Sequence, residues 1–122
     1  MYELFAEDSF SAAHRLINYA GNCSNWHGHN WTVRVVLAAA RLDEMGLACD
    51  LRDIKRALAD AVSPLDHAVL NDVPGLEGLN PTCENLARFF FHTLSSTLNS
   101  DAVRVTRVEV SETPSSGAAY FE

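Results

Sequence analysis

The sequence predicts an α+β domain in which two strands, two helices and two further strands follow one another. Three observations support this prediction: apolar and polar residues alternate near both ends of the chain, four-residue periodicity lies between them, and 48% of the 122 residues are hydrophobic. A chain of this length buries roughly two-thirds of its unfolded surface, enough for one core. We therefore expect residues 1–122 to form a single domain with a four-stranded antiparallel sheet and both helices on one face.

The first third of the chain has the period-two pattern of strands. Residues 2–16 place apolar side chains on one face and mostly polar ones on the other, with Asp8 as the exception on the inner face. Residues 17–26 are rich in Asn, Ser and Gly and indicate a loop. Alternation resumes at His27 and predicts a second strand to about Ala40. A turn and a short extended piece over 47–49 follow.

Two helices occupy the middle of the chain. Asp50 is the expected N-cap of the first helix, which ends at Ser63-Pro64. Residues 64–81 contain several Pro and Gly and read as irregular. Thr82 is the expected N-cap of the second helix, which runs to about Leu98.

The C-terminal part returns to strand. Residues 103–112 are rich in β-branched side chains, 113–117 form a turn, and 118–121 form a short last strand. A sheet this small leaves its edge strands open, which favours pairing between subunits.

Charge and composition exclude several classes of function. The formal net charge is −7 and there is no basic cluster, so we expect no nucleic-acid partner. The longest apolar runs are too short to span a membrane. The N-terminal segment is acidic where a secretory signal is basic, and three cysteines without regular spacing fit reduced thiols. We therefore expect a cytoplasmic protein.

Three histidines have the spacing of a metal site. His27 and His29 are two residues apart on a strand and project to the same side. His14 lies on the inner face of the first strand and joins them if the two strands are neighbours. Three imidazoles that leave a fourth position open are typical of catalytic zinc, although imidazole also binds nickel, copper and iron. The alternative is that these are ordinary histidines with structural partners.

Two cysteines are candidates for a reactive thiol. Cys23 lies in a polar loop four residues before His27, where a nearby cation would lower the thiol pKa. It could act as base, nucleophile or fourth ligand, or be an incidental surface residue. Cys83 falls in the first turn of the second helix, whose dipole is expected to lower its pKa. Cys49 has an apolar context and is expected in the core.

Acidic residues supply the remaining candidates. Asp66 can orient His67 for proton transfer, although an Asp-His pair is weak evidence by itself. Glu112 shares a strand face with Val108 and Val110 and is therefore expected to point inward, where a carboxylate needs a partner. That partner is either a ligand or an internal arginine.

Several segments together resemble the 6-pyruvoyl-tetrahydropterin synthase / 6-carboxy-tetrahydropterin synthase family. The resemblance spans nearly the whole chain in order and rests on these segments: Phe10 to Leu16, Cys23-x3-His27-Gly28-His29, Leu65 to Asp72, Asn80 to Leu86, and Ser111-Glu112-Thr113. It implies the tunnelling fold (T-fold) and a homohexamer of two stacked trimers, with active sites between subunits.

The resemblance also implies roles for individual residues. It implies Zn²⁺ on His14, His27 and His29, Cys23 as proton acceptor, and Asp66 with His67 as a second proton-transfer group. It implies that Glu112 anchors the pterin ring and that Thr82 and Glu84 contact the substrate, 7,8-dihydroneopterin triphosphate.

The short spacer between Cys23 and His27 resembles the bacterial 6-carboxy-5,6,7,8-tetrahydropterin synthase of queuosine biosynthesis, which releases triphosphate and acetaldehyde. The alternative within the family is a 6-pyruvoyl-tetrahydropterin synthase of the tetrahydrobiopterin pathway, which retains the side chain. An alternative from another class is a non-enzymatic, metal-stabilised pterin-binding oligomer. Relatives commonly have serine where this chain has Cys83.

Overall fold

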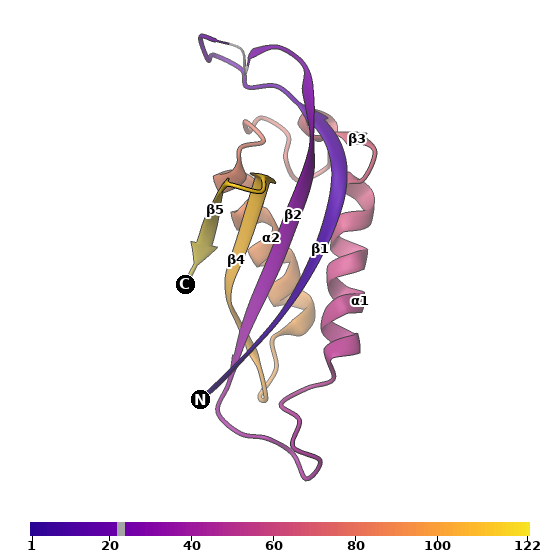
Figure 1. Cartoon of the computed structure of the whole chain (residues 1–122), viewed down its shortest axis with the longest axis vertical. Coiled ribbons are helices and arrows are strands. Elements are labelled where there is room, and N and C mark those ends of the chain that lie inside the picture. The colour runs from indigo at the N-terminus through magenta and orange to yellow at the C-terminus, as the bar shows by residue number, and fades with distance from the viewer. Residues whose placement is uncertain (22–23) are drawn as a thin grey trace.

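A computed structural model describes residues 1–21 and 24–122. The chain forms one sheet with two helices packed on one of its faces (Figure 1). Strands β1 (Tyr2–His14) and β2 (His27–Ala39) are long and antiparallel, and the described residues between them, 15–21 and 24–26, extend beyond the sheet. Strands β4 (Arg104–Thr113) and β5 (Ser116–Phe121) complete the C-terminal side.

The sheet has five strands in the order β3-β1-β2-β4-β5 and is mixed, so the expectation of four antiparallel strands is wrong. The additional strand, β3 (Ala68–Val69), pairs parallel to β1 at Ala12 and Ala13. Two residues are too few to show a period-two pattern, and they lie in a segment rich in turn formers. Pro64 to Pro81 is thus not wholly irregular, because it contains β3 and the short 3₁₀ helices η2 (Ser63–Leu65) and η3 (Leu70–Asp72).

Both helices begin at the predicted caps. The Asp50 carboxylate accepts from the backbone N–H of Arg52 at the start of α1 (Leu51–Val62). The Thr82 hydroxyl accepts from the backbone N–H of Asn85 at the start of α2 (Cys83–Leu98). Residues 47–49, by contrast, form no strand. The Asp43 carboxylate accepts from two backbone N–H groups of that loop and holds it as a turn instead.

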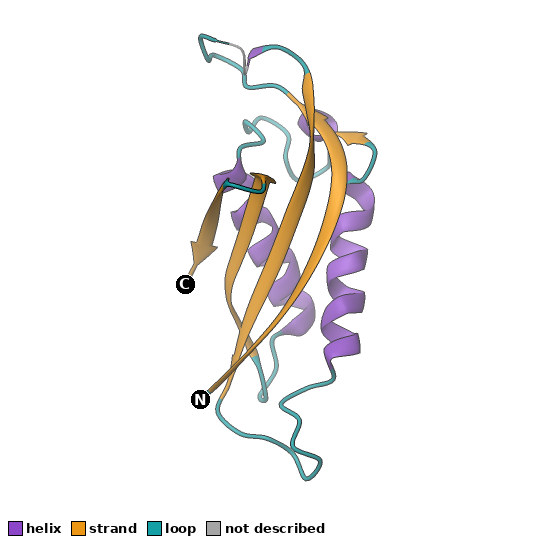
Figure 2. Ribbon diagram, in the orientation of Figure 1, coloured by secondary structure: helices purple, strands orange, loops and turns teal. Residues whose placement is uncertain are grey.

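The core lies between the helices and the sheet. Figure 2 shows α2 behind the strands and α1 alongside β1, with the front of the sheet uncovered. Odd-numbered residues of β2 and even-numbered residues of β1 face the helices, as the alternation predicts. Trp31 and Phe90 are the largest fully buried side chains. This packing fixes the ends of β1, β2 and β4 relative to the start of α2.

Candidate metal centre and active site

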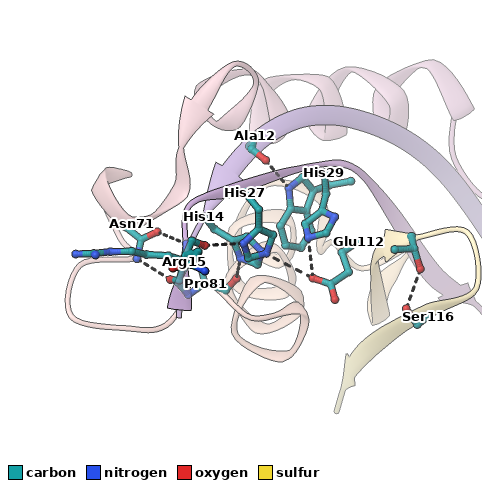
Figure 3. A network of polar contacts seen from close by, with 12 residues as sticks. Ala12, His14, Arg15, His27, His29, Asn71, Pro81, Glu112 and Ser116 are labelled. Carbon is teal, nitrogen blue, oxygen red and sulfur yellow. Dashed lines mark hydrogen bonds and ion pairs between the residues drawn. The ribbon is translucent and has the colours of Figure 1, made fainter. Parts of the chain in front are cut away.

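Three histidines meet where β1 ends and β2 begins. In the register of these strands His14 is opposite His27, and Ala12 is opposite His29, so all three rings point to the helix side. Their ligand nitrogens lie within 4.8 Å of one another (Figure 3). The structure thus brings together the three residues that the sequence pattern selected, because both strands keep the period of two up to their ends.

The hydrogen bonds of two of these rings leave a nitrogen free for a metal. His14 Nδ1 lies 2.8 Å from the carbonyl oxygen of Pro81, and His27 Nδ1 lies 2.7 Å from that of Asn25. A carbonyl only accepts, so each Nδ1 carries the proton and each Nε2 offers a lone pair. His14 Nε2 is buried and has no hydrogen-bond partner among the described residues. A buried orphan nitrogen beside two further imidazoles fits a bound cation.

Electrostatics around His14 also favour the neutral ligand form. The residue is 2% exposed, and burial lowers the pKa of its imidazole. Charge repulsion from His27 and His29 lowers that pKa further, whereas the Pro81 hydrogen bond and the Glu112 charge act to raise it. A metal binds neutral imidazole, so burial prepares His14 for ligation.

Glu112 reaches the same place from β4. Its Oε2 lies 3.6 Å from His29 Nε2 and 3.9 Å from His14 Nε2. It faces inward, as the strand period predicts, and its neighbours are histidines and not an internal arginine.

A cavity of about 340 Å³ opens beside the histidines and Glu112. It is lined by His14, Leu16, His27, Thr82, Cys83, Glu84, Glu112, Ser116 and Gly117. Thr82 and Glu84, which the resemblance selected, are therefore wall residues. The hairpin residues Ser116 and Gly117 were not predicted. A Cβ at Gly117 would collide with the carbonyl oxygen of Val110, so only glycine fits there without movement of the strands.

Cys83 also lines the cavity, but its thiol is not activated. The residue is 9% exposed, and burial together with the Glu112 charge raises its pKa to about 11. The expectation of a lowered pKa at this position is wrong, because burial of the thiol and the nearby Glu112 charge raise it. Cys49 is half-buried beside the core. Cys23 lies outside the described residues.

Asp66 and His67 lie apart from this cavity in the single chain. The Asp66 carboxylate accepts from the backbone N–H of Ser11 at 3.0 Å and lies 3.1 Å from His67 Nδ1. The Ser11 hydrogen bond is the main cause of the lowered pKa of Asp66. The side chain of His67 is 82% exposed and borders a separate shallow depression, which His29 also lines.

Comparisons with known proteins identify the family of this chain. The sequence model of the family described as 6-pyruvoyl tetrahydropterin synthase matches residues 3–122. The chain belongs to this family. It is 38% identical to a Synechocystis protein named 6-carboxy-5,6,7,8-tetrahydropterin synthase, with 99% of this chain and 94% of the relative covered. It is 34% identical to a Dictyostelium discoideum protein named 6-pyruvoyl tetrahydrobiopterin synthase, over 78% and 79% of the two chains.

The fold agrees as well. The Caenorhabditis elegans 6-pyruvoyl tetrahydropterin synthase structure superposes with a TM-score of 0.87 at 30% identity, covering 99% of this chain and 95% of that one. The predicted α+β class and the predicted family are thus confirmed, and with them a pterin synthase of the lyase class. No helix among the described residues is long and apolar enough to cross a membrane.

Proposed function

We propose that this protein is a zinc-dependent 6-carboxy-5,6,7,8-tetrahydropterin synthase that acts on 7,8-dihydroneopterin triphosphate. The observation that carries the proposal is the cavity itself, where three histidines and Glu112 converge. The name of the Synechocystis relative and the three-residue spacer between Cys23 and His27 support the carboxy product. The proposed setting is cytoplasmic queuosine biosynthesis.

His14, His27 and His29 would hold the metal through ring nitrogens that face one another. When bound, Zn²⁺ supplies Lewis-acid polarisation of the hydroxylated side chain of the substrate. Glu112 accepts hydrogen bonds from the N–H edge of the pterin ring, since its carboxylate is aimed into the cavity. Thr82 and Glu84 flank that ring from the start of α2.

Proton transfer is assigned to Cys23 and to the Asp66–His67 pair. The Asp66 carboxylate contacts Nδ1 of His67. Nε2 of His67 therefore points away from Asp66 and is free to exchange a proton. Because His67 is exposed and outside the cavity lining, it would serve a site completed by a second copy.

Two sheet edges support such an assembly. On the side away from β2, the described part of β1 pairs only with β3, at Ala12 and Ala13, so the edge from Tyr2 to Phe10 lacks a strand partner. β5 forms the other edge. Edge-to-edge pairing of copies would close a ring, in agreement with the proposed hexamer of two trimers.

The product decides between the two branches of the family. We expect incubation with 7,8-dihydroneopterin triphosphate to release triphosphate and acetaldehyde and to leave 6-carboxy-5,6,7,8-tetrahydropterin. Release of triphosphate without acetaldehyde would instead identify a 6-pyruvoyl-tetrahydropterin synthase, the second candidate, which the name of the Dictyostelium relative favours. Cys23→Ala should abolish turnover in either case, with metal still bound.

A further inference from the structure

Two asparagine side chains hold the chain just after His14. The Asn71 amide accepts from the backbone N–H of Arg15 at 3.1 Å and donates to the carbonyl of Arg15 at 3.0 Å (Figure 3). The Asn80 amide does the same at Ile17, at 2.7 and 3.0 Å. Each amide thus satisfies both backbone groups of one residue, as a neighbouring strand would.

These two contacts continue the sheet where its backbone pairing stops. Parallel pairing of β3 with β1 ends at Ala13 and Val69. Two residues further along each segment, the side chain of Asn71 takes over at Arg15, and Asn80 follows at Ile17. The exit of β1 is therefore held on the side opposite to its pairing with β2.

Asn80 has a second connection to the metal centre through its neighbour in sequence. Pro81 is buried, and its carbonyl accepts the Nδ1–H of His14. Proline has no N–H with which to anchor itself. Asn80 precedes it directly: the Asn80 backbone carbonyl accepts from Thr82 N–H at 2.8 Å and from the Asn85 side chain at 2.8 Å, while the Asn80 side chain binds Ile17.

We propose that Asn80, assisted by Asn71, is a positioning residue that fixes His14 and directs its Nε2 at the metal. The Asn80 side chain binds Ile17, in the segment that follows His14. The next residue, Pro81, supplies the carbonyl that sets the tautomer of His14, and the Asn80 carbonyl is bound by Asn85 in the first turn of α2. Among residues 1–21 and 24–122, the hydrogen-bond partner of the His27 ring is local, the carbonyl of Asn25 two residues away. The hydrogen bonds between residues far apart in the sequence are therefore made at and just after His14. The inference rests on the proposed metal centre and not on which pterin product forms.

The test compares Asn80→Ala with a matched control, Asn99→Ala. The Asn99 side chain also accepts from a backbone N–H, that of Val105 six residues later at 2.7 Å, but at the start of β4 and away from the histidines. We expect Asn80→Ala to weaken Co²⁺ binding about 10- to 100-fold and to change the visible spectrum of the bound Co²⁺, as loss of a group that orients a ligand does. Asn71→Ala should give a smaller loss, and Asn99→Ala should lower stability with Co²⁺ affinity unchanged.

A metal-free readout separates this inference from the proposed function. Nitrogen–proton NMR of the metal-free protein at neutral pH should show His14 with its proton on Nδ1 in the wild type and mixed tautomers in Asn80→Ala. If the wild type binds no Co²⁺, the metal centre fails, and the tautomer comparison still decides the role of Asn80.

Two results would overturn the role of Asn80: a folded Asn80→Ala with wild-type affinity and tautomer, or an equal loss of affinity in Asn99→Ala. If Asn80→Ala does not fold, Asn80→Asp gives the same comparison. It keeps the acceptor for Ile17 N–H, and it replaces the donor to the Ile17 carbonyl with a carboxylate oxygen that repels that carbonyl.

Discussion

Glu112 Oε2 lies 3.6 Å from His29 Nε2, and this distance places a carboxylate at the edge of the proposed metal centre. Two ligands of a tetrahedral zinc with bonds of 2.0–2.1 Å are about 3.3 Å apart. Glu112 is therefore near enough to be a fourth ligand and is also positioned to bind a substrate. Its place in the lining of the cavity fits both roles, and the proposed function assigns it the second.

Glu112→Gln should separate these two roles. We expect the substrate dissociation constant to rise about 10- to 100-fold, because a hydrogen bond to a charged group contributes about 1.5–3 kcal/mol. Zinc affinity should change by only a few-fold. Calorimetric titration of substrate and metal measures both. A loss of metal affinity beyond about 100-fold would make Glu112 a ligand, and an unchanged substrate constant would make it structural.

Cys83 should be inert to alkylation although it faces the cavity. With a pKa of about 11, only about one molecule in a thousand carries the thiolate at pH 8. In a Cys23→Ser, Cys49→Ser background we expect iodoacetamide to react at least about 100-fold more slowly than with a free thiol. Mass spectrometry of timed samples gives the rate. The matched variant that keeps only Cys23 is the control, and rapid labelling of Cys83 would show that this thiol is accessible and not buried.

The contrast between Glu112 and Cys83 shows which parts of the site the sequence can predict. The inward direction of Glu112 and the grouping of the histidines follow from strand period, which is local. The pKa of Cys83 depends on how much solvent the surrounding segments remove, and no local pattern encodes that. Similarly, β3 and the Ser11–Asp66 hydrogen bond join residues about 55 positions apart through a segment with no periodicity.

Stability of the metal-free protein should depend on pH through His14. In the unfolded chain this imidazole titrates near its ordinary pKa of 6.5, whereas burial lowers its pKa in the fold. As pH falls below 6.5, the unfolded chain therefore takes up a proton that the folded chain does not. The free energy of unfolding should decrease from pH 7 downward, by at most about 1.4 kcal/mol per pH unit for one proton, until the lowered pKa is passed.

Urea titrations in EDTA between pH 5 and 7.5 measure this dependence. His14→Phe removes the titrating group and should flatten the profile relative to the wild type. An unchanged slope in that variant would show that other groups cause the pH dependence.

Removal of the metal by a chelator should abolish activity, while the protein stays folded. The core between helices and sheet is formed by apolar residues such as Trp31 and Phe90, none of which needs a metal. We expect EDTA-treated protein to keep its far-ultraviolet circular dichroism and to regain turnover when Zn²⁺ is added. Unfolding on metal removal would instead support the non-enzymatic, metal-stabilised oligomer.

His67→Asn should separate activity from stability. His67 has a φ of 57°, in the left-handed region, which asparagine adopts more readily than histidine. We expect the free energy of unfolding to stay constant or rise by up to about 1 kcal/mol, since the backbone strain decreases and the exposed ring loses little packing. Turnover should fall by about 10²- to 10⁴-fold, the usual contribution of a general acid or base.

Urea unfolding and turnover, measured on the same preparation, test this trade-off. Asn18, with a φ of 63°, supplies the matched control, because Asn18→Ala places an unfavourable residue in the same backbone region and should lower stability. A His67→Asn protein that keeps full turnover would remove His67 from the proton-transfer step. One that loses more than about 1 kcal/mol would show that the His67 side chain supports the fold, because relief of left-handed strain acts in the opposite direction.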